Sequence, residues 1–453
     1  MNETIAALST APQTAGIHVI RMSGDDSVEI LKRVFEPASK IESFEHAHMY
    51  YGRVVDNGVA LDEVYAVSFY QPKSYTGENV VEIQCHGSGV LSGEILKLLL
   101  KNGATPAQPG EFTKRAYLNG KLDLVQAESV MDLLNATGKA ASKNAYEQLS
   151  GHLSERINSL KDIFVFVMAN IDVDIDFPEA DVEVVDRELL SAKLCEAKRI
   201  IDGMLSSVDE GRIIKEGIRV AICGLPNAGK SSLLNYLIGD DRAIVTDIPG
   251  TTRDVIEESV MINGIRVRLF DTAGLRHTED KIESIGIQRT KRAIDDGDIV
   301  LVMIDGTSES LGDENTELLH STRDKKRIVA LNKSDADIND SVIKDLDAMG
   351  VEYVVISART GDNIDLLKDK IYQTVMGGNS TESVCLTNAR QIHCIRHSGE
   401  ALQRAMEDMD AFMPLDIVGI GIREAYEGIL ELVGEGIDDS IINEIFTSFC
   451  LGK

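Results

Sequence analysis

The sequence predicts a protein of mixed α/β and α-helical class, built from three parts. Residues 1–118 alternate strand-like runs with helical runs, residues 119–216 and 377–453 have helical periodicity, and residues 217–376 return to alternating strands and helices. The two helical stretches flank the second alternating region. The simplest architecture is therefore an N-terminal α+β domain followed by a discontinuous helical domain, into which an α/β domain is inserted.

The N-terminal part alternates apolar runs with turn-rich segments. Its strand candidates are 16–24, 64–70 and 80–85, and its helix candidates are 27–35 and 89–100. A stretch rich in Pro, Ser and Gly at 71–77 predicts a turn between two of the strands. This pattern is typical of a compact α+β domain.

The helical part carries two apolar stripes at steps of three and four residues. One runs from Ile157 to Ile171 and the other from Leu190 to Met204. Pro178 lies between them, and a proline in a helix interior costs about 3 kcal/mol. We therefore expect two long helices with a break at 174–179. Further helices are expected at 400–413 and 422–433.

The composition limits the cellular compartment and the kinds of binding partner that we expect for the chain. The 453 residues carry a formal charge of −28, so contact with nucleic acid should be confined to a local basic patch or left to a partner. The six cysteines form no Cys-x-x-Cys pair, which indicates neither a zinc site nor a disulfide framework. The sequence shows no signal peptide and no run of membrane-spanning length, so we expect a cytoplasmic protein without membrane contact.

A phosphate-binding loop is predicted at 224–231, with the sequence Gly-Leu-Pro-Asn-Ala-Gly-Lys-Ser. It follows the apolar run 218–223 and precedes the helix-like run 233–237, as the chemistry requires. The glycines let backbone N–H groups turn toward phosphates, and the helix start adds positive dipole. Lys230 can reach the β- and γ-phosphates, and Ser231 can hold Mg²⁺.

The motif Asn332-Lys333-Ser334-Asp335 indicates which base the bound nucleotide carries. It follows a buried strand candidate at 328–331. The two carboxylate oxygens of Asp335 can accept N1–H and the exocyclic NH₂ of guanine. Adenine offers no such pair of donors and would be rejected. Ser357, Ala358 and Arg359 follow the strand candidate 353–356 and can support the base through backbone N–H groups.

Two further elements fit a Ras-like P-loop GTPase domain. Asp271-Thr272-Ala273-Gly274 follows a strand candidate, so Asp271 is placed to hold Mg²⁺ through water and Gly274 to contact the γ-phosphate. Thr252, in the run Gly250-Thr251-Thr252, is the candidate switch threonine that binds Mg²⁺ with Ser231. Asn263-Gly264 between two strand-like runs predicts a hairpin.

The group that orients the attacking water is not evident. Leu275 stands where Ras-like enzymes keep a glutamine, and a leucine cannot hold water. Arg276, Glu279, Asp280 and Glu283 are the nearby candidates, and the residues alone do not choose among them.

No arginine finger stands out in the sequence. A monovalent cation near the β- and γ-phosphates would supply that positive charge, and the side-chain oxygen of Asn227 suits such an ion. Asn227 can equally satisfy the backbone of its own loop. Both interpretations stay open.

Together these residues resemble the MnmE (TrmE) family of tRNA modification GTPases, and the resemblance covers essentially the whole chain. The motifs that carry it outside the GTPase elements are 75–82, 109–113, 115–124, 175–179 and 449–453. The last, Phe-Cys-Leu-Gly-Lys, is the most specific. Two departures are the run 11–16, where the family has a turn rich in Gly and Arg, and Gln108, where an arginine is common.

The resemblance implies a GTPase that works with a flavin-dependent subunit, as a heterotetramer, to install an aminomethyl-type group on C5 of the tRNA wobble uridine. It implies a homodimer formed by the N-terminal domain. That domain would bind 5-formyl- or 5,10-methylene-tetrahydrofolate through Arg21, Glu82, Lys121 and Lys453. Cations suit the carboxylates of the folate, and Glu82 can accept from its pterin N–H groups.

The resemblance also implies potassium activation and site residues. Asn227 and Thr251 match side-chain ligands of K⁺, and Thr246 and Ile248 match its backbone ligands. Glu283 matches the residue that orients water. Cys450 matches a cysteine required for the modification. The expected GTP contacts are Asn227, Ala228, Gly229, Lys230, Ser231, Ser232, Thr246, Thr251, Thr252, Asp271, Thr272, Ala273, Gly274, Asn332, Lys333, Asp335, Ser357, Ala358 and Arg359.

Two other functions remain as alternatives. One is a GTPase switch in ribosome assembly or signalling, without modification chemistry. Such a protein would carry an RNA-binding domain rich in Lys and Arg, which the acidic segments here do not supply. The other is a folate-binding protein that its GTPase only regulates.

Overall fold

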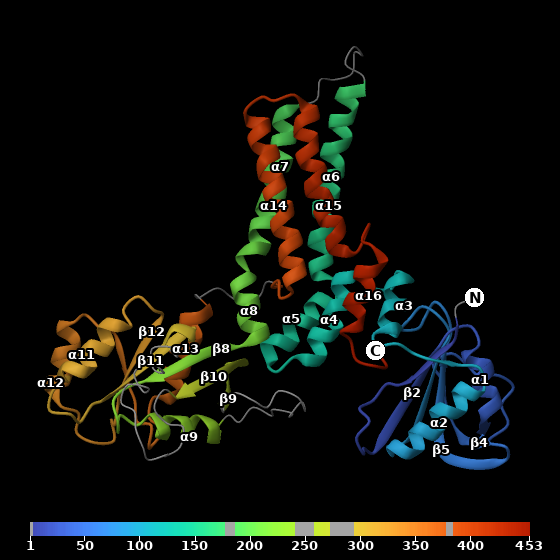
Figure 1. Ribbon diagram of the computed structural model, residues 1–453, viewed down its shortest axis with the longest axis horizontal. Coiled ribbons are helices and arrows are strands. Elements are labelled where there is room, and N and C mark those ends of the chain that lie inside the picture. Colours follow the sequence, from blue (N-terminus) through green and yellow to red (C-terminus); the bar gives the residue numbers. More distant parts are fainter. Residues whose placement is uncertain (1–2, 177–185, 241–257, 272–293, 377–383) are drawn as a thin grey trace. The chain divides into compact units, whose positions relative to one another are not determined.

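The structure, a computed structural model, describes residues 3–176, 186–240, 258–271, 294–376 and 384–453 (Figure 1). The chain forms two compact units. The first comprises Met1–Met131, Gln148–Lys198 and Cys394–Lys453, and the second comprises Asp132–Glu147 and Arg199–His393. Segments far apart in the sequence therefore share a unit, as the inserted-domain architecture requires. The predicted division at residues 118, 216 and 376 stays a prediction.

The first unit contains a seven-stranded sheet of order β3-β4-β5-β6-β2-β1-β7. Its neighbouring strands are antiparallel, except that β1 and β7 run parallel. The strands are β1 Ile5–Leu8, β2 Ile17–Ser23, β3 Phe35–Pro37, β4 Met49–Asp56, β5 Val59–Phe69, β6 Val80–His86 and β7 Thr105–Pro106. The strands expected at 16–24, 64–70 and 80–85 are confirmed.

The two faces of this sheet differ because successive side chains of a strand point to opposite sides. Helices α1 (Ser27–Val34) and α2 (Gly89–Lys101) pack on one face, over a core that includes Ile20, Met22 and Ile83. On β2 these apolar residues alternate with Arg21, which lies on the other face. That second face carries the N-terminal site described below.

Helix α3 (Glu111–Leu118) and the end of the chain pack together within the first unit. Phe446 of α16 (Asp439–Thr447) and Phe449 join Leu124 and Ala127 in a small core. The Tyr117 hydroxyl donates to the Gly434 carbonyl over 2.6 Å. These contacts dock the last residues of the chain against the N-terminal domain.

The helical part consists of long helices, and the two predicted stripes are confirmed as buried faces. Helices α6 and α15 run side by side in the first unit (Figure 1). The bounds are α4 Leu124–Asn135, α5 Lys139–Leu149, α6 His152–Asp176, α7 Arg187–Ser206, α14 Ala389–Asp410 and α15 Leu415–Val433. Helix α6 ends inside the predicted break, and residues 177–185 lie outside the described part of the chain.

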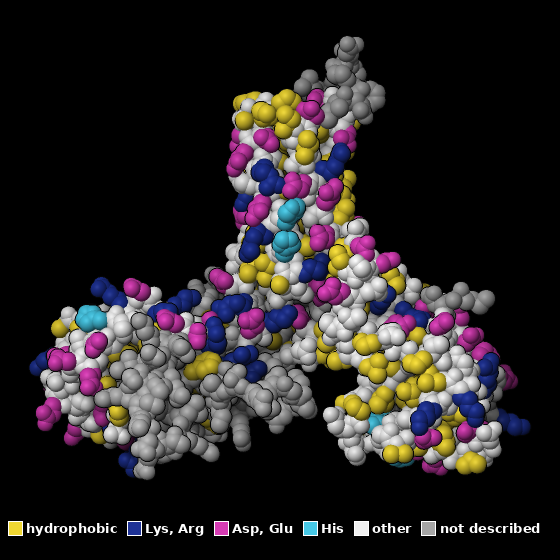
Figure 2. Space-filling model, in the orientation of Figure 1, with side chains coloured by type: hydrophobic (Ala, Val, Ile, Leu, Met, Phe, Trp, Pro, Cys, Tyr) yellow, Lys and Arg dark blue, Asp and Glu magenta, His cyan; other side chains and the backbone are white. Residues whose placement is uncertain are grey.

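Charge on the helical part is mixed. On the face shown in Figure 2, Lys and Arg side chains are interspersed with Asp and Glu along these helices. Within the described residues, no helix combines the length and the apolar character needed to cross a membrane.

The second unit contains a six-stranded mixed sheet of order β13-β12-β11-β8-β10-β9, in which only the β9–β10 pair is antiparallel. The strands are β8 Ile218–Cys223, β9 Glu258–Ile262, β10 Ile265–Asp271, β11 Ile299–Asp305, β12 Arg327–Asn332 and β13 Tyr353–Val355. The helices are α8 Val208–Glu216, α9 Lys230–Asp240, α11 Gly312–Ser321, α12 Asp340–Ala348 and α13 Ile364–Met376. The expected hairpin at Asn263-Gly264 joins β9 to β10.

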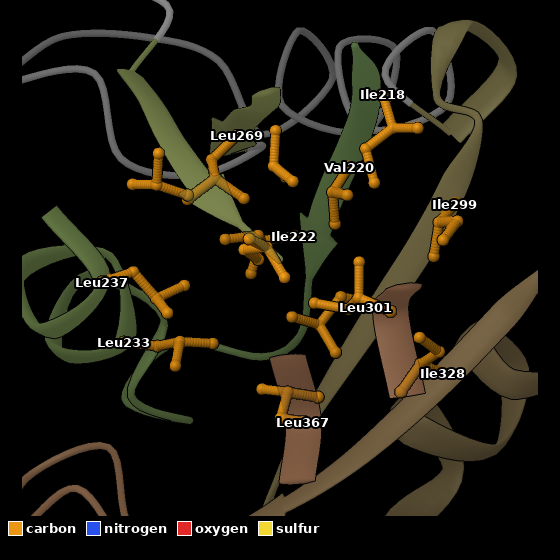
Figure 3. Close-up of a cluster of buried hydrophobic side chains, with 14 of the residues drawn as sticks. Ile218, Val220, Ile222, Leu233, Leu237, Leu269, Ile299, Leu301, Ile328 and Leu367 are labelled. Carbon is orange, nitrogen blue, oxygen red and sulfur yellow. The ribbon is translucent and has the colours of Figure 1, made fainter. Parts of the chain in front are cut away.

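The central strands of this sheet are buried on both faces, which is why they read as continuous apolar runs. Val220 and Ile222 of β8 face one core with Leu301 of β11 (Figure 3). Ala221 and Cys223 face the other core. This packing fixes the carboxyl ends of β8, β11 and β12, and the nucleotide-site residues follow these ends.

Candidate functional site

The predicted phosphate loop lies between β8 and α9, at the carboxyl end of a central strand. Gly224 and Gly229 have φ of +149° and +98°, which favour glycine. A Cβ on Gly224 would overlap the Met303 carbonyl, and one on Gly229 would overlap the Asn332 side chain. Only glycine fits at either position, so the neighbouring strands determine the shape of the loop.

Lys230 begins α9 and is buried. Its Nζ donates to the carbonyls of Gly224 and Leu225 over 2.8 and 2.9 Å. The ammonium therefore points back into the loop that follows β8, where phosphate oxygens can replace the two carbonyls as acceptors. Ser231 and Asn227 are exposed at the same loop, and Asn227 has φ of +65°.

Asn332 connects the phosphate loop to the base-recognition segment. Its Nδ2 donates to the Ala228 carbonyl over 2.7 Å, and its Oδ1 accepts from the Ala358 N–H over 2.9 Å. Asn332 is only 2% exposed. Ala358 thus supports the site by holding Asn332, because the Ala358 N–H is directed to that side chain.

Asp335 is oriented by Ser357 and Arg359. The Ser357 hydroxyl donates to Oδ1 over 2.7 Å, and an Arg359 guanidinium nitrogen lies 3.8 Å from Oδ2. Lys333 pairs with Asp305, the last residue of β11. The structure therefore brings together Asn332, Lys333, Asp335, Ser357 and Ala358 at one end of the sheet, beside the phosphate loop.

Several predicted residues cannot be placed. Asp271 ends β10 opposite Ile222 of β8, and only its backbone is described. The predicted residues that lie outside the described part of the chain are Thr246, Ile248, Thr251, Thr252, Thr272, Ala273, Gly274 and Glu283. Their roles stay predictions.

A second candidate site lies in the first unit, on the sheet face opposite α1 and α2. Arg21 of β2 is paired with Glu82 of β6 in the antiparallel register. The Arg21 Nε donates to Glu82 Oε1 over 2.9 Å, and a terminal guanidinium nitrogen lies 2.8 Å from the same oxygen. The guanidinium carbon lies 5.3 Å from the centre of the Tyr75 ring and 5.7 Å from that of Phe112.

Lys453 reaches this site from the far end of the chain. Burial and the nearby Arg21 guanidinium lower the pKa of Lys453, while Glu82 and Cys450 oppose that change. The carbonyl of Cys450 accepts from the Gly110 N–H over 3.3 Å, just before α3. Arg21, Glu82 and Lys453 thus converge. Lys121 lies on the adjacent turn, where it donates to the Pro72 carbonyl over 3.1 Å.

An ion-pair network holds α3 beside this site. Arg115 lies 3.0 Å from Glu78 and 2.8 Å from Glu111, and Ser23 donates to Glu78 over 2.7 Å. These four residues, like Tyr75 and Phe112, were not assigned a role from the sequence. The sequence offered a clue to them, because most of these residues lie in or next to the family motifs 75–82, 109–113 and 115–124. Their partners became evident only from the packing.

The second site combines cationic side chains, a carboxylate and aromatic rings. Arg21 and Lys453 lie near the carboxylate of Glu82, and the rings of Tyr75 and Phe112 lie against the Arg21 guanidinium. No group of three or more His, Cys, Asp or Glu suited to a metal ion occurs among the described residues.

Comparisons with known proteins cover the whole chain. The family model of the TrmE N-terminus matches residues 4–121, and the model of the MnmE helical domain matches residues 124–450. A protein of Natranaerobius thermophilus named tRNA modification GTPase MnmE is 44% identical over 458 residues, covering 100% of this chain and 99% of the relative. Relatives with the same name from Ligilactobacillus salivarius and Acetivibrio thermocellus are 42% and 41% identical, covering 100% of this chain and 98% and 99% of each relative.

Proposed function

The chain belongs to the MnmE family of tRNA modification GTPases, and from this we propose that it uses a potassium-activated GTPase cycle to modify the wobble uridine of tRNA. It would act with a flavin-dependent partner to install an aminomethyl-type (carboxymethylaminomethyl) group on C5. A tetrahydrofolate would supply one carbon. The observation that carries the proposal is the convergence of Arg21, Glu82 and Lys453 in a chain that also holds a guanine site.

GTP is the nucleotide that the described geometry supports. Ser357 donates to the carboxylate of Asp335, and such a carboxylate can accept from the Watson–Crick edge of guanine. Asn332 ties that segment to the phosphate loop, so the base and the phosphates bind to one connected frame. Ser231 at the start of α9 is a suitable Mg²⁺ ligand, with Thr252 as its proposed companion. We assign the orientation of water to Glu283.

Potassium activation is proposed on the exposed Asn227 together with Thr246, Ile248 and Thr251. A cation there would compensate the charge that develops on the phosphates. Of these four residues, only Asn227 lies in the described part of the chain. Its backbone is left-handed, so glycine is the replacement that adds no backbone strain.

Hydrolysis is therefore expected to be at least about tenfold faster in KCl than in NaCl, since losing a stabilising contact in the transition state typically costs 10²–10³ in rate. An Asn227→Gly variant should bind GDP normally yet lose most of the potassium stimulation. Phosphate release measured in the two salts is the assay. Equal stimulation in the variant and the wild type would remove Asn227 from the ion site.

Folate binding is proposed at the site of Arg21, Glu82 and Lys453. Glu82 suits the N–H donors of a pterin, and the neighbouring Arg21 and Lys453 suit acceptor groups of the same ligand. Burial and the nearby Arg21 lower the pKa of Lys453, and a bound acceptor group would favour its charged form. The bound tetrahydrofolate would supply a carbon at the formaldehyde or formate oxidation level. The protein groups bind and orient it.

A Glu82→Gln variant is expected to bind 5-formyl-tetrahydrofolate about tenfold more weakly, because it loses a charged acceptor and leaves Arg21 without its ion pair. Isothermal titration calorimetry on the full chain measures this. Glu94→Gln on α2, which removes an exposed ion pair with Lys97, is the matched control. Unchanged affinity in Glu82→Gln would contradict the assignment.

A homodimer through the N-terminal domain is part of the proposal. Met49, Tyr51 and Tyr65 lie on the same sheet face as Arg21 and are about half exposed, at 49%, 46% and 48%. The rings of the two tyrosines lie 5.4 Å apart. Exposed aromatic residues of this kind are enriched in protein interfaces. The partner subunit, the tRNA, the heterotetramer and a cytoplasmic location complete the proposal.

The alternative is a GTPase switch in ribosome assembly or signalling. The site of Arg21, Glu82 and Lys453 favours the modification function, because a pure switch has no use for a second ligand site beside Cys450. We assign Cys450 to the modification step. Cys450 is exposed, and its carbonyl is held by Gly110.

A further inference from the structure

Asp305 stands beside the guanine site, although no motif includes it. It is the last residue of β11 and lies opposite Asn332 in the parallel pairing with β12. The carboxyl ends of parallel strands meet at one edge of a sheet, which is where such folds bind ligands. Asp305 therefore belongs by position to the edge that carries Asn332 and Asp335.

Both oxygens of the Asp305 carboxylate are engaged. Oδ1 accepts from the Thr307 N–H over 3.0 Å and from its hydroxyl over 2.7 Å. Oδ2 accepts from the Nζ of Lys333. Burial alone would raise the pKa of Asp305, but the hydrogen bonds from Lys333 and Thr307 outweigh burial and hold the pKa below its usual value. The carboxyl group is therefore ionised at neutral pH.

The turn that presents Asp305 is itself held by the base-recognition segment. The Gly306 N–H donates to the Asn332 carbonyl over 2.9 Å, and the Gly306 carbonyl accepts from the Asn339 N–H over 2.8 Å. Lys333 has φ of +73°, a conformation that costs a non-glycine residue free energy and occurs mainly where function requires it. Both partners of the ion pair therefore start from constrained backbone.

We propose that Asp305 is a positioning residue for guanine binding, which acts by holding the ammonium of Lys333. A lysine side chain has four methylene groups and loses much rotamer freedom when it is ordered. Pairing the ammonium with Asp305 orders that chain before the nucleotide arrives. The methylene groups are then ready to cover one face of the base, and the entropic cost of binding falls.

The test is a double-mutant cycle on the full chain, with the affinity for fluorescent methylanthraniloyl-GDP as the readout. Asp305→Asn is expected to weaken binding about three- to tenfold, the size expected for losing a partly exposed ion pair together with side-chain order. Lys333→Ala is expected to weaken binding by a similar or larger factor. In the Lys333→Ala background, Asp305→Asn should change the affinity by less than twofold.

Two outcomes would overturn the proposal. In one, Asp305→Asn binds within twofold of the wild type. In the other, its effect persists unchanged in the Lys333→Ala background, which would mean that Asp305 acts through its own turn rather than through Lys333. Asp324→Asn, an exposed substitution of the same kind, is the matched control. Thermal unfolding of each variant separates a loss of affinity from a loss of folding.

Discussion

An Asp335→Asn variant is expected to lose at least about a thousandfold in GTP affinity and to gain binding of xanthosine triphosphate. The carboxylate accepts two N–H groups of guanine, whereas an amide presents one acceptor and one donor. Guanine then faces a donor against its own NH₂, while xanthine, with a carbonyl in that place, is matched. Sites built on hydrogen bonds discriminate by such large factors because a mismatch leaves polar groups unpaired.

Competition binding with GTP and xanthosine triphosphate measures this change in nucleotide preference. The exposed Asp337→Asn, two residues further along the chain, is the matched control and should keep its preference for GTP. Since Ser357 donates to Oδ1 of Asp335 and an amide oxygen can accept the same bond, the fold of the site should be preserved. A variant that still prefers GTP would show that Asp335 does not recognise the base.

The substitution Gly452→Ala adds a single methyl group. It is expected to weaken binding of 5-formyl-tetrahydrofolate by roughly ten- to a hundredfold. Gly452 has φ of +88°, and a Cβ there would overlap the Leu8 carbonyl and lie 2.7 Å from the Cα of Ser9. Backbone atoms cannot yield as a flexible side chain can. The last residues of the chain must therefore shift, and Lys453 leaves Arg21 and Glu82.

Gly436 provides a matched control for this substitution. Its φ is +77°, so alanine meets similar backbone strain, but a Cβ there has nothing within 4 Å. Gly436→Ala should keep folate affinity near that of the wild type, and both variants should keep GDP affinity, because the nucleotide site lies in the other unit. Equal folate binding in Gly452→Ala and Gly436→Ala would show that docking of the chain end does not build the site.

Local patterns predicted the strands, loop and helix that carry the candidate nucleotide residues, because these residues follow strands whose apolar runs are easy to recognise. The run 218–223 became β8, and the loop and helix followed as expected. The same rule also applies to Asp305, which ends the apolar run of β11. It was missed because no motif names it, and only the register of β11 with β12 shows that it reaches Lys333.

The N-terminal site was less accessible to sequence reasoning. The contact of Arg21 with Glu82 depends on the pairing of β2 with β6, which a strand pattern does not specify. The contacts of Arg21 with Tyr75 and Phe112 depend on tertiary packing of segments distant in sequence. Only the family resemblance associated Lys453 with Arg21. Residues 241–257 and 272–293 carry the predicted switch residues and the potassium ligands other than Asn227, and their roles stay predictions.

The most direct test of the proposed function is mass spectrometry of tRNA nucleosides from cells with and without this protein. Loss of aminomethyl-type uridines on deletion is predicted, with recovery on expression of the wild type but not of Cys450→Ser. Unchanged wobble uridines in the deletion strain would contradict the modification function and leave the GTPase switch as the function to examine.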